Sequence, residues 1–318
     1  MLYYTPVHIT PPPVTISHHD SVFLIGSCFT THIAEKLKGN LFNVLANPFG
    51  VLYNPSSIEQ SIAIIKNKRT IHASDFFVED GIYKSFLFHS KLADTHLDSL
   101  IVNTNQTISE THVFFKKSNW FFITLGTAYV YELKDSGETV ANCHKQNPNI
   151  FNHRLLSIEE VTNKLKNSYH QILELSPEAN IVFTVSPVRH LKLGAHLNQV
   201  SKSTLLIAIH TIINECKRAL YFPSYEIFMD ELRDYRYYAS DMLHPSDIGI
   251  EHVWNRFSQL FFDKQTQELN NQITEIKTAL RHRPLFPESE SFSVFKKQLE
   301  QKINRLKEKA PFLNIENI

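Results

Sequence analysis

Cysteine is scarce in this sequence, and its spacing excludes two kinds of small stabilised fold. The 318 residues contain three cysteines, Cys28, Cys143 and Cys216, with no Cys-x-x-Cys pair. This odd number and spacing argue against a disulfide framework and against a zinc ribbon. The 17 histidines include no His-Glu-x-x-His or similar ligand spacing, so the sequence predicts neither a metal site nor a cofactor.

Net charge and long apolar runs are also lacking. Lys and Arg together number 32, as do Asp and Glu, so no overall charge attracts nucleic acid or an anionic membrane. No segment approaches the roughly 20 apolar residues of a membrane span, and residues 1–6 lack the basic and apolar regions of a signal peptide. We therefore expect a cytoplasmic protein with reduced thiols and without a nucleic-acid or membrane partner.

What is present is a repeated strand-helix pattern in a chain of globular composition. Hydrophobic residues make up 42% of the chain and charged residues 20%. Apolar strands are expected at residues 22–25, 42–46, 120–125, 181–185 and 225–229. Helical spacing of apolar residues is found at 30–38, 55–65, 158–175, 205–213 and 253–261. This alternation predicts a parallel sheet with crossover helices.

Three segments depart from that rhythm. Residues 67–119 predict an insertion over the sheet edge, with a hairpin at Asp80-Gly81 and a helix at 94–117. Residues 129–131 and 138–140 predict a second hairpin, which would return residues 142–145 to the end of the third strand. After residue 262, two charged helical segments at 264–282 and 292–309 predict a C-terminal extension over 263–318, suited to a surface or a homodimer contact.

The chemistry is expected at the end of the first strand. Its apolar run stops at Gly26-Ser27, and open α/β sheets hold their active sites at the carboxyl ends of their strands. A nucleophilic serine needs a general base and a group that orients the base. Asp241 and His244 are three residues apart, which places both on one face of a turn. A helix cap with a surface histidine, and a plain turn at Ser27, explain the same residues without catalysis. Cys28 is interpreted as a packed hydrophobic residue.

Six ordered motifs, at residues 26–29, 47–50, 125–128, 142–145, 186–190 and 241–246, together resemble the GSCFA family. This bacterial family is named for a Gly-Ser-Cys-Phe-Ala motif and is similar to the SGNH (GDSL-type) hydrolases. The resemblance covers residues 23–262, with Thr30 in the place of the final alanine. With the strand-helix pattern, it predicts one doubly wound α/β domain over 1–262, of flavodoxin-like SGNH type, with five parallel strands in the order 2-1-3-4-5.

The resemblance also implies catalytic roles. Ser27 would be the nucleophile, His244 the general base and Asp241 its orienting carboxylate, with backbone N–H groups of Ser27 and Gly50 in the oxyanion hole. The third SGNH block usually reads Gly-x-Asn-Asp, but residues 126–129 read Gly-Thr-Ala-Tyr. An oxyanion donor is therefore missing, and we expect Asn142 to replace it, with Thr127 and His144 as alternatives.

Polar residues in the other motifs are the expected substrate contacts. They are Asn47, His89, His144, Lys145, Arg189 and His190. The alternative for the histidines and basic residues is a structural polar network under the insertion. By analogy of fold, the predicted activity is hydrolysis of a small acyl ester, such as an acetyl ester, of a carbohydrate or similar polar substrate through an acyl-serine intermediate. An acyltransferase using the same serine and a non-catalytic ligand-binding domain are the alternatives.

Overall fold

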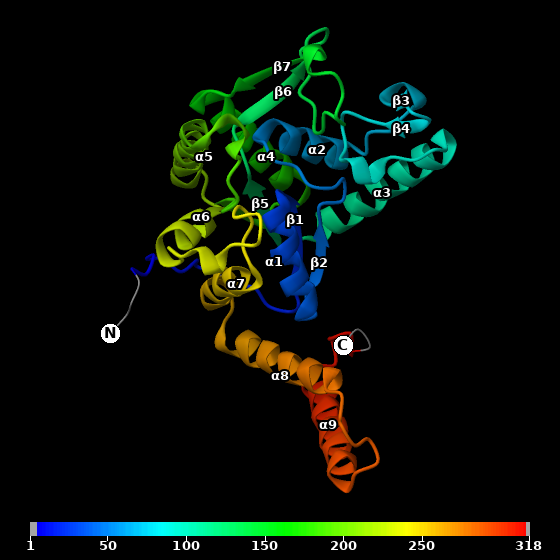
Figure 1. Ribbon diagram of the computed structural model, residues 1–318, viewed down its shortest axis with the longest axis vertical. Coiled ribbons are helices and arrows are strands. Elements are labelled where there is room, and N and C mark those ends of the chain that lie inside the picture. The colour runs from blue at the N-terminus through cyan, green and yellow to red at the C-terminus, as the bar shows by residue number, and fades with distance from the viewer. Residues whose placement is uncertain (1–4, 316–318) are drawn as a thin grey trace.

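The computed structural model describes residues 5–315, and a five-stranded parallel sheet lies at its centre (Figure 1). The strands are arranged in the order β2-β1-β5-β8-β9. Their bounds are β1 Ser21–Gly26, β2 Asn43–Ala46, β5 Trp120–Leu125, β8 Asn180–Val185 and β9 Ala219–Tyr221. Each neighbouring pair is parallel. Counted along the chain, this is the order 2-1-3-4-5, so the predicted sheet is confirmed.

Helices cover both faces of the sheet, because side chains alternate across each strand. In β1, Phe23 and Ile25 enter one core cluster, whereas Val22 and Leu24 enter the other. The first face is covered by α2 Pro55–Asn67, α3 Leu97–Lys117, α4 Ile158–Leu175 and α5 Ala195–Glu215. The second is covered by α1 Cys28–Gly39 and α7 Asp247–Phe261. The fold is therefore doubly wound.

The segment between α2 and β5 contains the predicted hairpin. Its strands are β3 Phe77–Glu79 and β4 Ile82–Lys84. The turn residues Asp80 and Gly81 both have positive φ, as a two-residue hairpin turn requires. The expected position over the sheet edge is wrong for α3, which packs on the face of the sheet. The Phe115 ring lies 5.0 Å from the ring of Phe23 and 4.6 Å from that of Phe121.

A second antiparallel pair stands above the sheet (Figure 1). It joins β6 Tyr129–Leu133 to β7 Phe151–Leu155. Residues 138–140, the predicted partner of β6, add hydrogen bonds such as Val140 N–H to Tyr131 O at 2.9 Å, but β7 pairs along the whole strand. The predicted hairpin is therefore present, with an antiparallel bridge between Glu132 and Thr139, and the chain returns beside β6 before residue 142. The longer pairing of β6 with β7 was not predicted.

The fifth strand also differs from the prediction. Residues 225–229 are helical, in α6 Ser224–Glu226 and the π-helical turn Ile227–Glu231, whereas β9 is the short strand just before them. Pro223 separates the two, because proline has no N–H for a strand ladder. Ile227 and Phe228 are buried in the core by this helical segment, which explains the apolar density that resembled a strand.

The C-terminal segments form a helix pair that projects from the α/β unit (Figure 1). They are α8 Lys264–Arg281 and α9 Glu290–Lys309, and they share a small apolar cluster. A domain division after residue 262 stays a prediction. Short 3-10 turns lie at Ala73–Asp75, Ser90–Leu92, Pro148–Ile150, Leu191–Leu193 and Tyr235–Tyr237. Across residues 5–315, no helix has the length and apolar content that spanning a membrane needs.

Candidate active site

Ser27 lies at the carboxyl end of β1 and is the N-terminal cap residue of α1. It is 1% exposed, and its Oγ has no hydrogen-bond partner among the described residues. Gly26 permits this close position, because a Cβ at Gly26 would lie 2.2 Å from the carbonyl oxygen of Thr124 in β5. A buried, unpartnered hydroxyl at the positive end of a helix suits an oxygen that develops negative charge during a reaction.

Asp241 and His244 form a hydrogen-bonded pair in the loop before α7. Asp241 Oδ2 lies 2.6 Å from His244 Nδ1, while Oδ1 accepts from the backbone N–H groups of Leu243 and His244 at 2.9 Å each. Hydrogen bonds lower the pKa of Asp241 to about 2. The largest effect comes from the backbone N–H of His244, followed by the His244 imidazole and the backbone N–H of Leu243. Because an ionised carboxylate only accepts, Nδ1 of His244 is the nitrogen that donates to it, and Nε2 is the ring nitrogen left for another partner.

This pair lies near the N-terminal half of α1. Burial raises the pKa of Cys28, and the Asp241 carboxylate adds to that effect. Burial likewise lowers the pKa of His32 in α1, and the charge of His244 adds to it. In the described structure, no hydrogen bond joins Ser27 Oγ to His244. Catalytic hydrogen bonds are often longer in free enzymes than in substrate complexes, so this absence is compatible with a shared role for the three residues.

The two backbone groups expected in the oxyanion hole already have acceptors. Ser27 N–H donates to the Thr124 carbonyl at 3.1 Å, and Gly50 N–H donates to the Asn47 carbonyl at 2.9 Å across the turn of residues 47–50. Asn47 itself occupies a more informative position. Its Oδ1 accepts from Gly26 N–H at 2.8 Å, while its buried Nδ2 has no partner among the described residues. Asn47 is thus bonded to the residue that precedes Ser27, and its amide nitrogen is an unused donor.

The residues expected to replace the missing asparagine are placed elsewhere. Asn142 Oδ1 accepts from the backbone N–H of His144 at 2.7 Å, and its Nδ2 lies 3.4 Å from Ser90 Oγ. Thr127 Oγ1 lies 3.0 Å from Ser201 Oγ and accepts from Tyr129 N–H. Both residues line a pocket that does not include Ser27. The return of the chain predicted from residues 138–140 therefore brings Asn142 to this pocket.

The expected substrate residues divide between structural and accessible positions. His144 is buried, with Nε2 2.7 Å from the Ser85 carbonyl oxygen, and burial lowers its pKa. It belongs to the polar network under the β3–β4 hairpin, and Lys145 beside it is exposed. His89 packs over Gly50, where an added Cβ would lie 2.3 Å from His89 Cβ. Arg189 lines a separate hollow with Tyr235 and Leu243.

His190 is the one expected substrate residue that lines the first pocket. It packs edge-on against Tyr53 with 5.3 Å between ring centroids, and its Nε2 would lie 3.0 Å from a Cβ at Gly126. Burial, together with the nearby Lys202 and His244, lowers the pKa of His190 to about 4. Its imidazole is therefore neutral near pH 7 and acts as a hydrogen-bonding group.

Lys202 is a buried polar residue that the sequence interpretation missed. It is fully buried in α5, and its Nζ donates to the carbonyl oxygens of Gly126 at 2.8 Å and Ser186 at 2.7 Å. These carbonyls follow the ends of β5 and β8, so the lysine joins two strand-end loops. A signal was present, because position 202 lies on the apolar face of α5 with Leu205 and Ile209.

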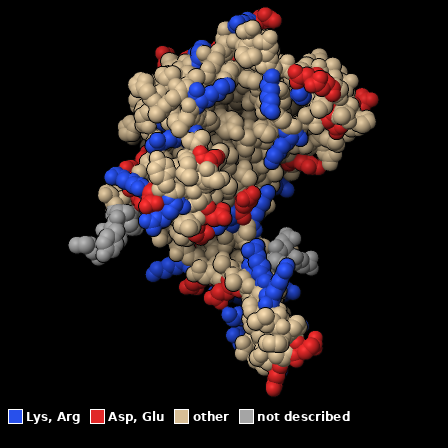
Figure 2. Space-filling view, viewed as in Figure 1, with Lys and Arg blue, Asp and Glu red and all other residues tan. Residues whose placement is uncertain are grey.

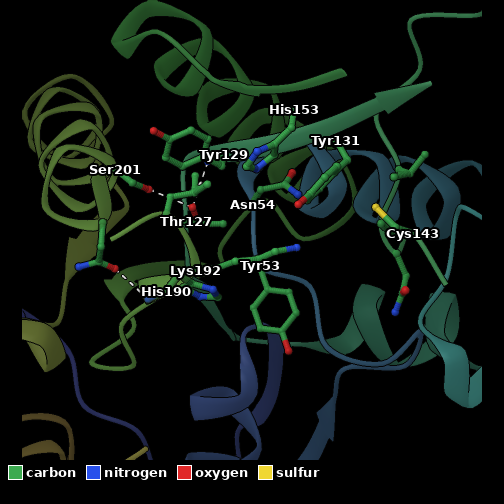
Figure 3. Close-up of a pocket in the computed structure, with 15 residues that line it drawn as sticks. Tyr53, Asn54, Thr127, Tyr129, Tyr131, Cys143, His153, His190, Lys192 and Ser201 are labelled. Carbon is green, nitrogen blue, oxygen red and sulfur yellow. Dashed lines mark hydrogen bonds between the residues drawn. The ribbon is translucent and has the colours of Figure 1, made fainter. Parts of the chain in front are cut away.

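The pocket lies between the β6–β7 pair and the strand ends, with a volume of about 420 Å³. Figure 3 shows Tyr129, His153 and Tyr131 on its upper side, with Tyr53 and His190 below. Figure 2 shows the molecular surface hollowed beneath the β6–β7 pair. Within residues 5–315, no group of three or more His, Cys, Asp or Glu side chains is placed to hold a metal ion.

Comparison with known proteins identifies the family. None of the curated proteins compared with the chain matches it. Among solved structures, an acetyl xylan esterase from the rumen bacterium Butyrivibrio proteoclasticus is similar, with 10% identity and a TM-score of 0.36. The alignment covers 82% of this chain and 64% of that enzyme, so the chain spans less than two thirds of its length. The model of the GSCFA family matches residues 21–257, and that of the GSCFA domain protein, C-terminal domain, matches residues 273–318. The first match extends from β1 into α7, and the chain therefore belongs to the GSCFA family.

Proposed function

We propose that this protein is a serine esterase that removes a small acyl group from a polar substrate. The observation that carries this proposal is the 2.6 Å bond between Asp241 and His244. A buried and unpartnered Ser27 hydroxyl stands at the carboxyl end of β1, and the Asp241 charge reaches the next residue, Cys28. An ionised carboxylate, an imidazole with a free Nε2 and a serine are the three groups that acyl transfer through serine requires.

The reaction follows from these roles. Ser27 Oγ attacks the ester carbonyl carbon while its proton moves to His244 Nε2, and the carbonyl oxygen becomes an oxyanion. The tetrahedral intermediate collapses, the bond to the alcohol oxygen breaks, and His244 returns the proton to that oxygen. Water then attacks the acyl-serine with His244 as base, which releases the carboxylic acid and restores the hydroxyl. Asp241 holds the imidazole orientation throughout.

Asn47 is our candidate for the oxyanion donor. Its Oδ1 accepts from the backbone N–H of Gly26, which fixes the amide so that Nδ2 is the free end. That nitrogen is buried without a partner in the described structure, as is Ser27 Oγ nearby. An unpaired buried donor costs free energy in the free protein, and its use in a hydrogen bond in another state of the protein would account for its presence. Stabilising the oxyanion during the reaction is such a use.

A small acyl group fits the closed surroundings of Ser27. The serine is 1% exposed, and the neighbouring Phe29 and Phe49 are both buried. The residues that line the first pocket do not include the serine. A long acyl chain would need space beside Ser27, whereas an acetyl group needs little. A carbohydrate alcohol is proposed because the pocket beside this edge combines aromatic and polar groups.

Turnover and covalent labelling test the proposal together. We expect hydrolysis of p-nitrophenyl acetate and labelling by a fluorophosphonate probe, both lost in Ser27→Ala. Ser99→Ala, at an exposed serine of α3, is the matched control and should retain both. If wild type and Ser27→Ala behave alike in both assays, the protein is not a serine esterase and the non-catalytic domain is favoured. If turnover rises with added sugar acceptor, the same serine acts as an acyltransferase.

A further inference from the structure

The pocket beneath the β6–β7 pair has a wall of stacked rings. Tyr129 and Tyr131 are two residues apart on β6 and so share one face, and His153 on β7 pairs with Tyr131. The His153 ring lies 4.1 Å from that of Tyr131 at 19° and 5.1 Å from that of Tyr129 at 29°. The three rings present carbon surface together with hydroxyl and imidazole polar atoms (Figure 3).

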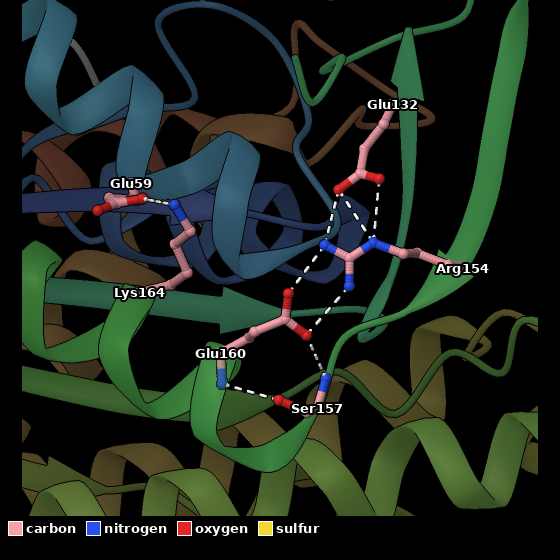
Figure 4. Close-up of polar contacts among 6 residues, drawn as sticks. All are labelled: Glu59, Glu132, Arg154, Ser157, Glu160 and Lys164. Carbon is pink, nitrogen blue, oxygen red and sulfur yellow. Dashed lines mark hydrogen bonds and ion pairs between the residues drawn. The ribbon is translucent and has the colours of Figure 1, made fainter. Parts of the chain in front are cut away.

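The β6–β7 pair that carries these rings is joined to the core by ion pairs. Arg154 of β7 donates to Glu132 of β6 and to Glu160 of α4 (Figure 4). Glu160 also forms a capping box with Ser157 at the start of α4. Hydrogen bonds from Arg154 and from the Ser157 backbone lower the pKa of Glu160 to about 2, so this carboxylate is ionised. The ring wall is thus joined to a helix of the core and is preformed for a ligand.

Three asparagines in the same pocket are held in a shared way. In each, the side-chain oxygen accepts a hydrogen bond from a backbone N–H. Ser57 N–H donates to Asn54 at 2.8 Å, His144 N–H to Asn142 at 2.7 Å and His190 N–H to Asn198 at 2.8 Å. Fixing the oxygen orients each amide nitrogen as a donor. Within residues 5–315, the one hydrogen bond from these nitrogens is the long contact of Asn142 to Ser90.

The lining therefore selects a class of ligand. It contains oriented donors and the cation Lys192, and no carboxylate among its described residues. A cationic ligand is disfavoured, whereas a molecule rich in oxygen acceptors is favoured. The aromatic wall favours a molecule that also has an apolar face. A pyranose has both properties, with hydroxyl and ring oxygens around its rim and C–H groups on its faces. The pocket volume of about 420 Å³ suits a small ligand of this kind.

The pocket also adjoins the candidate catalytic edge. Its floor includes Tyr53, whose pKa is raised by burial and by the nearby Cys28. In Figure 3 the Tyr53 hydroxyl points away from the ring wall, toward the segment of α1. Leu52, the residue before Tyr53, donates its N–H to the Gly26 carbonyl at 2.9 Å. The segment that carries Tyr53 is thus hydrogen-bonded to Gly26, the residue before Ser27.

We propose that this pocket binds a pyranose ring of the substrate, with the ring against Tyr129, Tyr131 and His153 and its oxygens on the three asparagine amides. That the bound molecule is the substrate rests on the proposed esterase function. The ring would lie on the alcohol side of the ester, and its acylated hydroxyl would extend past Tyr53 toward Ser27.

Saccharide binding can be measured without turnover. The full-length Ser27→Ala chain is titrated with cellobiose, xylobiose and N,N′-diacetylchitobiose, followed by saturation-transfer NMR. We expect at least one of these to bind and its affinity to fall at least about tenfold in Tyr131→Ala. Asn142→Asp, which retains an oxygen for His144 N–H but removes the donors, should also weaken it. Tyr235→Ala, an exposed tyrosine outside the pocket, is the control and should bind as the parent does.

The outcomes separate this inference from the proposed function. If none of the three saccharides binds, or if binding is the same in Tyr131→Ala and Asn142→Asp, the pocket assignment is overturned. Binding of adenosine without saccharide binding would assign the pocket to nucleosides and would also overturn it. Turnover of p-nitrophenyl acetate by the wild-type chain tests the esterase independently. Circular dichroism of both variants shows whether they are folded, and Asn142→Asp at a half-exposed position is expected to be.

Discussion

Replacing Lys202 with methionine should change how the stability of the protein depends on pH. The side chain is fully buried, and two backbone carbonyl oxygens accept hydrogen bonds from its Nζ. Burial lowers the pKa of Lys202 to about 7, an effect that Cys28 opposes and Arg189 increases. A neutral amine has two N–H donors, which matches the two carbonyls of Gly126 and Ser186. We infer that the folded protein holds this lysine largely neutral above pH 7.

The magnitude follows from proton binding in the two states. The unfolded chain keeps the Lys202 proton up to its ordinary pKa of 10.5, whereas the folded chain keeps it only below about 7. Between these values the unfolded state binds more protons, so the free energy of unfolding rises with pH. From pH 7 to pH 9 this one group contributes a rise of about 2 kcal/mol. Methionine removes the rise, and the two carbonyls left without a donor cost about 1–3 kcal/mol each at any pH.

Equilibrium urea unfolding followed by circular dichroism measures this difference between about pH 7 and pH 9. The stability gap between wild type and Lys202→Met should widen as the pH rises. Lys217→Met, at an exposed position, controls for the loss of one positive charge, and repeating the pair in Cys28→Ser removes the neighbouring thiol. A gap that stays constant across the range would show that Lys202 remains charged in the fold, and the reasoning from burial would be refuted.

Three further substitutions address the proposed catalytic edge and its packing. Asn47→Asp keeps the oxygen that accepts from Gly26 but removes the free amide donor, so kcat should fall by about 10²–10³ with little change in KM; an unchanged kcat contradicts the assignment. Asp241→Asn should lower kcat for p-nitrophenyl acetate by about 10⁴, because the orienting carboxylate is lost, and a normal rate would remove it from the mechanism. Gly126→Ala introduces a Cβ 3.0 Å from a side-chain nitrogen and should destabilise the fold by about 1–3 kcal/mol in thermal unfolding. Gly39→Ala, with nothing within 4 Å of its Cβ, is the control, and equal effects would contradict the packing argument.

The central strands β1, β5 and β8 could be located because they are buried and are written as unbroken apolar runs. The order of the sheet came from the resemblance to the GSCFA family together with the strand-helix pattern. The pairing of Asp241 with His244 could be predicted from the sequence because the two residues are three positions apart within one turn. β7 was not, because its residues Asn152, His153 and Arg154 are exposed and polar, which removes the alternation that identifies a strand. The fifth strand was placed too late in the chain because β9 has only three residues, whereas the segment that follows it has a longer apolar run.

The state of the hydrogen-bonding groups at the site was beyond reach of the sequence. Whether Ser27 N–H is free depends on the carbonyl of Thr124, which lies about a hundred positions away in the chain and is brought near by the pairing of β1 with β5. The same holds for Lys202, whose acceptors come from the ends of two other strands. A pattern of residue types predicts which side chains share an edge of the sheet. Which of their N–H groups lack an acceptor is known only when all backbone contacts are known.

The departure from Gly-x-Asn-Asp at residues 126–129 has a structural reason. Ala128 stands where that pattern has its asparagine, but here the residue is fully buried and its N–H donates to Ser201 Oγ at 2.8 Å. An amide side chain at this position would enter the apolar core, where an unpaired polar group is costly. β1 is flanked by β5 on one side and by β2 on the other, so a donor for the Ser27 edge can also come from the end of β2. Asn47 follows β2 directly, and its unpartnered Nδ2 is consistent with a donor transferred from one neighbour of β1 to the other. On this reasoning, introducing asparagine in Ala128→Asn should not rescue kcat in the Asn47→Asp variant, and a recovery of activity would show that the third-block position still faces the serine.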